Sequence, residues 1–299
     1  IVDEGGLKVI TTLDFSMQEK AEKVIRNFSS TLENQFNASN TAMVAINPKN
    51  GDILTMVGSR DYFDKKIDGN FNVATAFRQP GSTFKPFVYA TVFMKGYTPD
   101  TVLFDVETEF STQCTPEGKP KDDSVDPKKC YSPVEYDGIF EGPMPIREAL
   151  AHSRNIPAVK TLYLAGIQES LNTAKAMGIS SLKDPNRYGL TLVLGGGEVS
   201  LLELTSAYGV FANDGVRNKY RSILRVEDSN GKILEEAVND PSESIQPQIA
   251  RQITDILSDT KVRMSSLIPV GESLGGRPVA IKTGTTNDKR DNWTIGGNP

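Results

Sequence analysis

The stretch RQPGSTFKPF, residues 78–87, places a serine and a lysine three positions apart at the start of an apolar segment. A proline inside a helix loses a backbone hydrogen bond and clashes with the carbonyl four residues earlier, so Pro86 must lie in the first turn. We therefore expect a helix from about Ser82 to Lys95 that stops at Gly96. Ser82 then sits at its N-terminal end.

A serine and a lysine at this spacing allow two interpretations. Residues three apart on a helix share a face, so Lys85 can reach the Ser82 hydroxyl and act as its base, and apolar neighbours favour the neutral amine. Alternatively, Ser82 only caps the helix and Lys85 is exposed. The motif alone does not decide, because it recurs elsewhere in the chain, at Ser180–Lys183, Ser229–Lys232 and Ser258–Lys261.

Two further motifs follow. Ser153, Arg154 and Asn155 lie between two predicted short helices, PIREALAHS and IPAVKTLYLAG. Ser-x-Asn is a weak signal, repeated at residues 170–172, and a helix-cap turn explains it equally well. The stretch KTGTT, residues 282–286, occurs once and follows an apolar strand start. A cation, hydroxyls and a glycine that admits close backbone approach indicate a carboxylate-binding edge, although a Gly/Thr strand end is the simpler alternative.

The rest of the chain predicts an α+β fold. Asn50-Gly51 and Asn230-Gly231, each flanked by alternating apolar residues, predict two hairpins. A helix capped by Asp14 or Ser16 should run to about Phe28, followed by a polar connection. Strands at both ends of the chain with helices between them favour α+β over alternating βαβ units.

The composition excludes several classes. The net charge is −5 and basic residues are spread along all 299 positions, so we expect no nucleic-acid partner. One histidine and two cysteines are too few for a His/Cys metal centre, and we expect no metal or cofactor. His152 precedes Ser153, but neighbouring side chains point in different directions, so we expect packing or a surface contact rather than a Ser-His pair.

Cys114 and Cys130 lie in a polar, Pro-rich stretch that predicts a loop. They either close it as a disulfide in an oxidising compartment or are two unrelated thiols.

The stretch LGGGE, residues 194–198, lacks the Gly-Lys-Ser/Thr of a phosphate loop, so we expect a plain loop before a helix capped by Ser200 and Glu203. No apolar run is long enough to span a membrane and the start lacks signal-peptide features, so the chain as given is expected to be soluble.

Taken in order, the three motifs match the signature of penicillin-binding proteins and class A β-lactamases. The chain resembles the transpeptidase domain of a class A, bifunctional penicillin-binding protein over nearly its whole length. The resembling stretches are LKVITTLDFSMQ, RQPGSTFKPF, SRNIPAVKTLYLAG, LGGGEVSLLELTSAYGVFANDG and KTGTTNDKRDNW.

The resemblance implies an antiparallel sheet flanked by helices plus a mainly helical subdomain. Residues 1–40 would be an interdomain linker strand and helix, and residues 41–299 the transpeptidase domain. That domain would be truncated at the C-terminus, with strands missing that join the Lys282 strand to the first hairpin. The parent would be a membrane-anchored, extracytoplasmic protein with an upstream glycosyltransferase domain.

The resemblance also implies roles for the motif residues. Ser82 would attack the D-Ala-D-Ala carbonyl of a peptidoglycan stem peptide, with Lys85 as base, and β-lactams would acylate it. Ser153 would pass a proton to the leaving D-alanine and Asn155 would hold the substrate amide. The remaining residues would bind the substrate carboxylate (Lys282, Thr283, Gly284 and Thr285) or, through the N–H groups of Ser82 and Thr285, form the oxyanion hole.

Three other functions use the same residues. A D,D-carboxypeptidase would transfer the acyl group to water, and a penicillin sensor or scaffold would be acylated without turning over peptide. A weak β-lactamase is the third, but position 154 is arginine rather than the aspartate of Ser-Asp-Asn, and the chain lacks a Glu-x-x-Leu-Asn element for deacylation.

Overall fold

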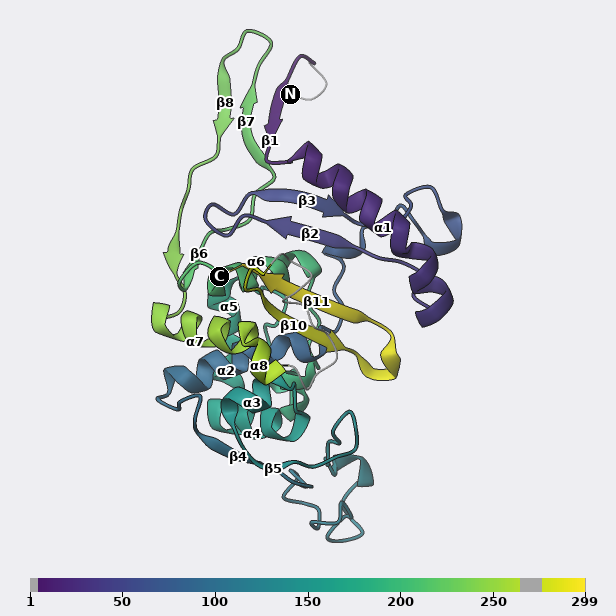
Figure 1. Cartoon of the computed structure of the whole chain (residues 1–299), viewed down its shortest axis with the longest axis vertical. Coiled ribbons are helices and arrows are strands. Elements are labelled where there is room, and N and C mark those ends of the chain that lie inside the picture. The colour runs from purple at the N-terminus through teal and green to yellow at the C-terminus, as the bar shows by residue number, and fades with distance from the viewer. Residues whose placement is uncertain (1–4, 264–275, 299) are drawn as a thin grey trace. The chain divides into compact units, whose positions relative to one another are not determined.

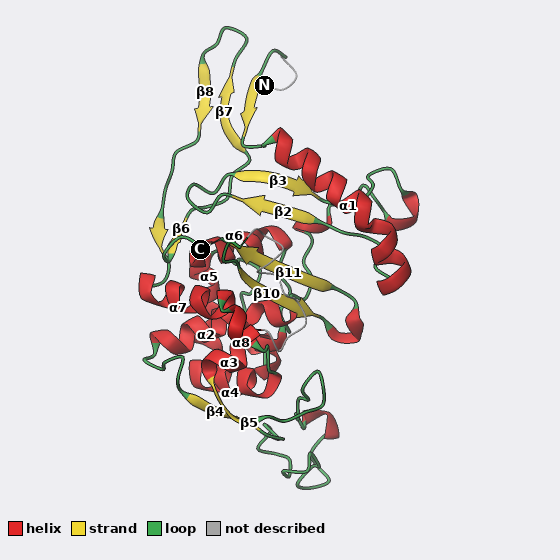
Figure 2. Ribbon diagram, viewed as in Figure 1, coloured by secondary structure: helices red, strands yellow, loops and turns green. Residues whose placement is uncertain are grey.

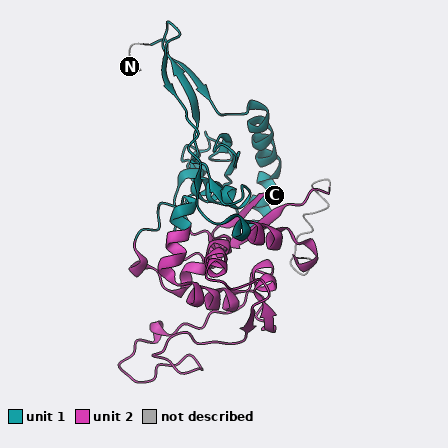
Figure 3. Cartoon of the chain, turned by 90° about the vertical axis from the view of Figure 1, so that its left-hand side faces the viewer, with its two compact units in different colours: residues 1–78, 174–183, 198–250 teal, residues 79–173, 184–197, 251–299 magenta. Residues whose placement is uncertain are grey.

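The computed structural model describes residues 5–263 and 276–298. The chain groups into two compact units, shown in teal and magenta in Figure 3. Unit 1 comprises residues 1–78, 174–183 and 198–250, and unit 2 comprises residues 79–173, 184–197 and 251–299. Both contain helices and antiparallel strand pairs (Figure 2), which confirms the predicted α+β class.

The strands of unit 1 form small antiparallel groups (Figure 1). Their bounds are β1 (Lys8–Thr11), β2 (Met43–Ile46), β3 (Ile53–Val57), β6 (Val216–Arg217), β7 (Ile223–Glu227), β8 (Ile233–Glu236) and β9 (Ser242–Glu243). The order is β1-β7-β8 in one sheet, while β2 pairs with β3 and β6 with β9. The turns at Asn50-Gly51 and Asn230-Gly231 join β2 to β3 and β7 to β8, so both predicted hairpins are confirmed.

Helix α1 (Phe15–Phe36) packs on the β2–β3 hairpin through Ala21 and Ile25, which are buried against Val57. Its N-cap is Asp14, whose carboxylate accepts from Met17 N at 3.0 Å, as one of the two predicted caps. The helix runs eight residues past the predicted end at Phe28. Scattered serines and asparagines do not stop a helix whose turns still include leucine and glutamate; the left-handed residue at Asn37 (φ 53°) stops it.

Helix α6 (Leu201–Phe211) begins at the predicted cap but without the full capping box. The Ser200 hydroxyl accepts from Glu203 N at 3.1 Å. The Glu203 carboxylate instead binds Ser180, accepting from its backbone N–H and its hydroxyl. One half of the predicted reciprocal cap therefore forms, and Glu203 ties the helix to the segment before it.

Unit 2 is mainly helical. Its elements are α2 (Lys85–Met94), α3 (Ile146–Ala151), α4 (Asn155–Ala165), α8 (Thr260–Arg263), β4 (Val102–Asp105), β5 (Gly142–Pro145), β10 (Ala280–Thr285) and β11 (Asn292–Gly297). Strand β4 pairs with β5 and β10 with β11. Helices α5 (Ile167–Met177) and α7 (Pro247–Ser258) each have residues in both units. The two predicted helices around Ser153 are confirmed as α3 and α4.

Helix α2 is the buried central helix of unit 2. Its first nine residues, Lys85 to Phe93, are all buried, and it packs against α4. A 3₁₀ turn, η4 (Gly81–Phe84), precedes it, so the predicted helix start is a tighter turn followed by the α-helix. Pro86 is the second residue of α2, where its missing N–H costs nothing. Among the described helices, none is long and apolar enough to cross a membrane.

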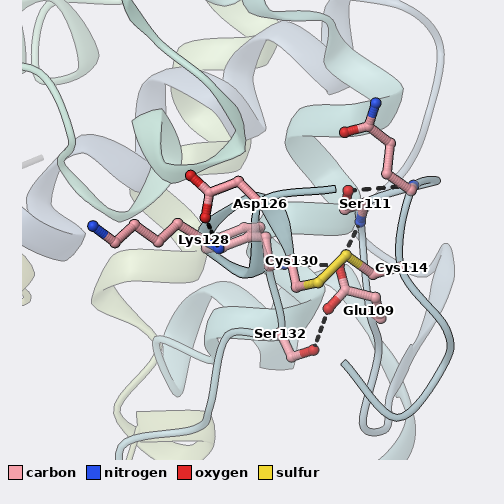
Figure 4. The surroundings of a disulfide bond; sticks show 9 residues. Glu109, Ser111, Cys114, Asp126, Lys128, Cys130 and Ser132 are labelled. Carbon is pink, nitrogen blue, oxygen red and sulfur yellow. Dashed lines mark hydrogen bonds between the residues drawn. A yellow bond between two sulfur atoms is a disulfide. The ribbon is translucent and has the colours of Figure 1, made fainter. Parts of the chain in front are cut away.

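The two cysteines are paired. Cys114 and Cys130 form a disulfide that closes the predicted loop between β4 and β5 (Figure 4). Beside it, the Glu109 carboxylate accepts from the backbone N–H groups of Ser111 and Tyr131, both at 2.7 Å. The disulfide and this carboxylate therefore hold the ends of one loop together.

Opening the disulfide should loosen this loop. A crosslink across 16 residues of sequence separation restricts the unfolded loop by an entropy worth about 3 kcal/mol. Replacing both cysteines with serine should therefore speed amide hydrogen exchange between residues 114 and 130 by up to about 100-fold. Exchange in α4 serves as the internal control. Equal exchange rates with and without the disulfide would show that other contacts hold the loop.

Candidate active site

The turn that presents Ser82 is built on close backbone contacts. Gly81 has φ 57°, and a Cβ there would lie 2.7 Å from Thr285 O. A Cβ on Gly195, in the Gly-rich segment, would lie 2.3 Å from Gly81 N. Side chains at either glycine would force these backbones apart. Ser82 is half-buried, and in the described part of the chain its hydroxyl makes no hydrogen bond.

The third motif packs against this turn. A Cβ on Gly284 of β10 would lie 2.4 Å from Pro80 O and 2.9 Å from Thr83 N. Strand β10 therefore runs directly beside the turn that holds Ser82. Thr283 is half-buried and Thr285 is exposed, with Asn292 Nδ2 3.3 Å from its hydroxyl oxygen.

Lys85 is fully buried, and its ammonium binds the second motif rather than Ser82. Nζ donates to Ser153 O at 2.5 Å, Arg154 O at 2.9 Å and Asn155 Oδ1 at 2.9 Å, with Ser153 Oγ at 3.4 Å. Within the described residues no bond joins it to the Ser82 hydroxyl. Burial lowers the pKa of Lys85 to about 7; the Glu135 carboxylate acts to raise it and the Arg154 cation to lower it.

Ser153 is where the second and third motifs meet. Lys282 Nζ donates to Ser153 Oγ at 2.7 Å and to Thr283 O at 2.9 Å. Ser153 has φ 61°, a left-handed conformation that is costly for a non-glycine residue and is found where the surroundings impose it. Burial, followed by the charges of Lys85 and Arg263, holds the pKa of Lys282 well below its usual range.

The structure therefore brings together residues from all three predicted motifs. Lys85, Ser153, Asn155 and Lys282 form one hydrogen-bonded group, although they are separated by up to almost 200 positions in the chain. Ser82 lies one turn before Lys85 and beside β10, which supplies Thr283, Gly284 and Thr285. Two of the other Ser-x-x-Lys serines bind elsewhere: the Ser180 hydroxyl donates to Glu203 and the Ser258 hydroxyl donates to Thr254 O.

His152 has the expected packing role. Its Nε2 lies 2.8 Å from Val262 O, and its Nδ1 lies 3.7 Å from Glu141.

Sequence reasoning missed a buried ionic cluster beneath the second motif. Arg154 is completely buried, and its guanidinium lies 2.9 Å from Asp105 and Asp137 and 3.5 Å from Glu135. Asp105 and Glu135 are buried too. Burial acts to lower the pKa of Arg154, but the surrounding carboxylates outweigh it and raise that pKa. The only available signal was an arginine in the middle of a Ser-x-Asn motif, which does not identify its partners.

Comparison with known proteins gives consistent matches. The family described as "Penicillin binding protein transpeptidase domain" matches residues 41–296. Penicillin-binding protein 1A of Neisseria lactamica is 33% identical over 264 residues, 86% of this chain and 31% of that protein. Penicillin-binding protein 2D of Bacillus subtilis is 32% identical over 308 residues, 100% of this chain and 40% of that protein. The chain thus spans well under half of these relatives.

Solved structures share the fold. Penicillin-binding protein 1A from Haemophilus influenzae has a TM-score of 0.70 at 25% identity, covering 86% of this chain and 41% of that one. The PonA1 protein from Mycobacterium tuberculosis in complex with penicillin V has a TM-score of 0.75 at 23% identity, covering 100% of this chain and 76% of that one.

Proposed function

The chain belongs to the penicillin-binding protein transpeptidase domain family, and from that membership we propose that it is a serine D,D-transpeptidase that cross-links peptidoglycan stem peptides. The observation that supports this best is the convergence of Lys85 and Lys282 on Ser153, beside the turn of Ser82. A half-buried hydroxyl with no hydrogen bond among the described residues, a buried amine with a pKa near neutrality and a second hydroxyl between two lysines are the parts that acyl transfer needs.

In the proposed reaction, Ser82 attacks the carbonyl between the two terminal D-alanines and Lys85 accepts its proton. Ser153 passes a proton to the leaving D-alanine nitrogen, and the acyl group stays on Ser82 as an ester. An amine from a neighbouring stem peptide then attacks this ester and releases the serine. The bond made is the new amide cross-link.

The remaining residues bind and polarise the substrate. Asn155 holds the substrate amide, while Lys282, Thr283 and Thr285 bind the terminal carboxylate. The backbone N–H groups of Ser82 and Thr285 form the oxyanion hole, where each donor is worth about 3 kcal/mol. Gly284 admits the close approach of β10 to the Ser82 turn, and a Cβ there would meet Pro80 O at 2.4 Å.

We also propose the setting of this reaction. Residues 1–40 join the domain to an upstream glycosyltransferase domain in a longer, membrane-anchored protein. The domain works on the extracytoplasmic side, and the Cys114–Cys130 disulfide supports an oxidising compartment.

A fluorescent penicillin tests the active-site assignment, and a stem peptide ending in D-Ala-D-Ala tests the reaction. We expect stable label on Ser82 by peptide mapping, and an amide product when a D-amino acid acceptor is added. Release of D-alanine with water alone would indicate a carboxypeptidase, and stable label without peptide turnover a sensor. Rapid loss of label would indicate a β-lactamase. A folded chain that takes no label at Ser82 would refute the proposal.

A further inference from the structure

A carboxylate from a distant part of the chain caps the helix that begins at Asn155. Glu135 is buried and accepts from Asn155 N at 2.7 Å and from Ile156 N at 2.6 Å. Arg154, the residue at the N-cap position of α4, makes no side-chain cap bond. Because the first N–H groups of a helix lack partners and favour negative charge, Glu135 supplies the missing cap from 20 positions earlier.

This cap fixes which way Asn155 faces. Its N–H is held by Glu135, and its Nδ2 donates to Val134 O at 2.8 Å. That leaves Oδ1 pointing to Lys85 Nζ at 2.9 Å. Two adjacent residues, 134 and 135, therefore set both the backbone and the amide orientation of the asparagine that contacts Lys85.

Glu135 is itself held by an ion pair with Arg154. Arg154 lies 3.5 Å from its carboxylate and 2.9 Å from Asp105, and the exposed acids Asp137 and Glu141 contact the other side of the guanidinium. A guanidinium with several carboxylate partners is a rigid anchor because its donors lie in a fixed plane. Arg154 thus holds the capping carboxylate in place.

From this arrangement we propose that Glu135 is a positioning residue for the reaction: it orients Asn155 and, through it and its own charge, sets the position and protonation of Lys85. The inference rests on the proposed function, since it takes Lys85 as the base. It deepens that function by adding a residue outside the three motifs.

The negative charge of Glu135 acts on the pKa of Lys85 in one direction. Three charged groups face Lys85: Glu135 from the segment before β5, Arg154 from the start of α4 and Lys282 from β10. Two more lie one step further away, because Arg263 of α8 faces Lys282 and Asp105 of β4 faces Arg154. Glu135 alone among those acting directly on Lys85 acts to raise its pKa. Neutralising Glu135 should therefore lower the pKa of Lys85.

The test compares Glu135→Gln with Glu135→Asp and with Glu109→Gln. Glu109 is a matched control because it also accepts from two backbone N–H groups but lies outside the Lys85 group. Two quantities are measured against pH: the second-order rate constant for acylation by penicillin, and the Lys85 titration midpoint by NMR of ¹³C-labelled lysine, assigned with Lys85→Met. Circular dichroism checks folding.

We expect Glu135→Gln to lower the plateau acylation rate by about 10- to 100-fold, because misplacing a catalytic group by about 1 Å has effects of that size. The pH midpoint should move to lower pH in both measurements. Glu135→Asp should lose rate but keep a midpoint closer to that of the unmodified chain, and Glu109→Gln should change neither.

Unchanged rate and midpoint in Glu135→Gln would overturn the proposal, as would a uniform loss of rate with the midpoint unmoved, which would indicate a merely structural cap. If the glutamine variant does not fold, a Glu135→Asp variant with the full acylation rate would overturn it. If the unmodified chain takes no penicillin, the proposed function fails, but the NMR midpoints still decide whether Glu135 acts on Lys85.

Discussion

Replacing Ser82 with alanine should abolish acylation, with a loss of about 10⁶-fold in rate, the size seen when a serine nucleophile is removed. The hydroxyl is the proposed site of the ester, so no covalent adduct can form without it. The substitution should leave stability nearly unchanged, because Ser82 is half-buried and its hydroxyl bonds to nothing among the described residues. Fluorescent-penicillin labelling after denaturation measures the loss.

The chain supplies its own control for this experiment. Ser229 belongs to another Ser-x-x-Lys pair and lies on the exposed turn between β7 and β8. Ser229→Ala should label as fully as the unmodified chain. Stable label on a folded Ser82→Ala protein would place the nucleophile elsewhere, and mass mapping would identify it.

Local patterns predicted most of the elements because their causes are local. The Asn-Gly turns set both hairpins, Asp14 set the start of α1, and Pro86 set the start of the α2 region. The predicted end of α1 was wrong because no single residue between Phe28 and Asn37 forbids a helix. The three motifs were found for a different reason, since their order is a family signature.

The cluster around Arg154 could not be predicted from such local patterns. Its partners, Asp105, Glu135 and Asp137, lie 17 to 49 positions away, and Glu135 lies 20 positions from the N–H it caps. The chain has 38 acidic residues, and an acidic side chain is almost always exposed unless it is paired. Only the three-dimensional structure shows that Asp105 and Glu135 are buried beside Arg154.

The position of Lys85 was predicted but its bonding was not. Spacing placed it on the same face as Ser82, yet within the described ranges its Nζ binds acceptors from residues 153–155. In this unliganded structure, the amine and the nucleophile share no hydrogen bond among the described residues. Unliganded sites commonly show such loose catalytic pairs.

Lys85 should give the acylation rate its pH dependence. Only the neutral amine can accept the Ser82 proton, so the rate should be low at acidic pH and rise with a midpoint near the Lys85 pKa of about 7. An ordinary lysine, with a pKa of about 10.4, would be neutral in only about one molecule in a thousand at pH 7.4. Burial therefore makes the base available at neutral pH.

Replacing Lys85 with methionine should lower the acylation rate by about 10²- to 10⁴-fold, the usual contribution of a general base, and flatten the rise with pH. Lys95→Met is the matched control, because Lys95 is exposed just after the same helix and its ammonium donates to Leu164 O at 3.3 Å, outside the Lys85 group. The control should keep both rate and midpoint. A midpoint that persists near 7 in the Lys85→Met protein would assign the titration to another group, and Lys282, whose pKa is also lowered and which donates to Ser153, would then be the residue to replace next.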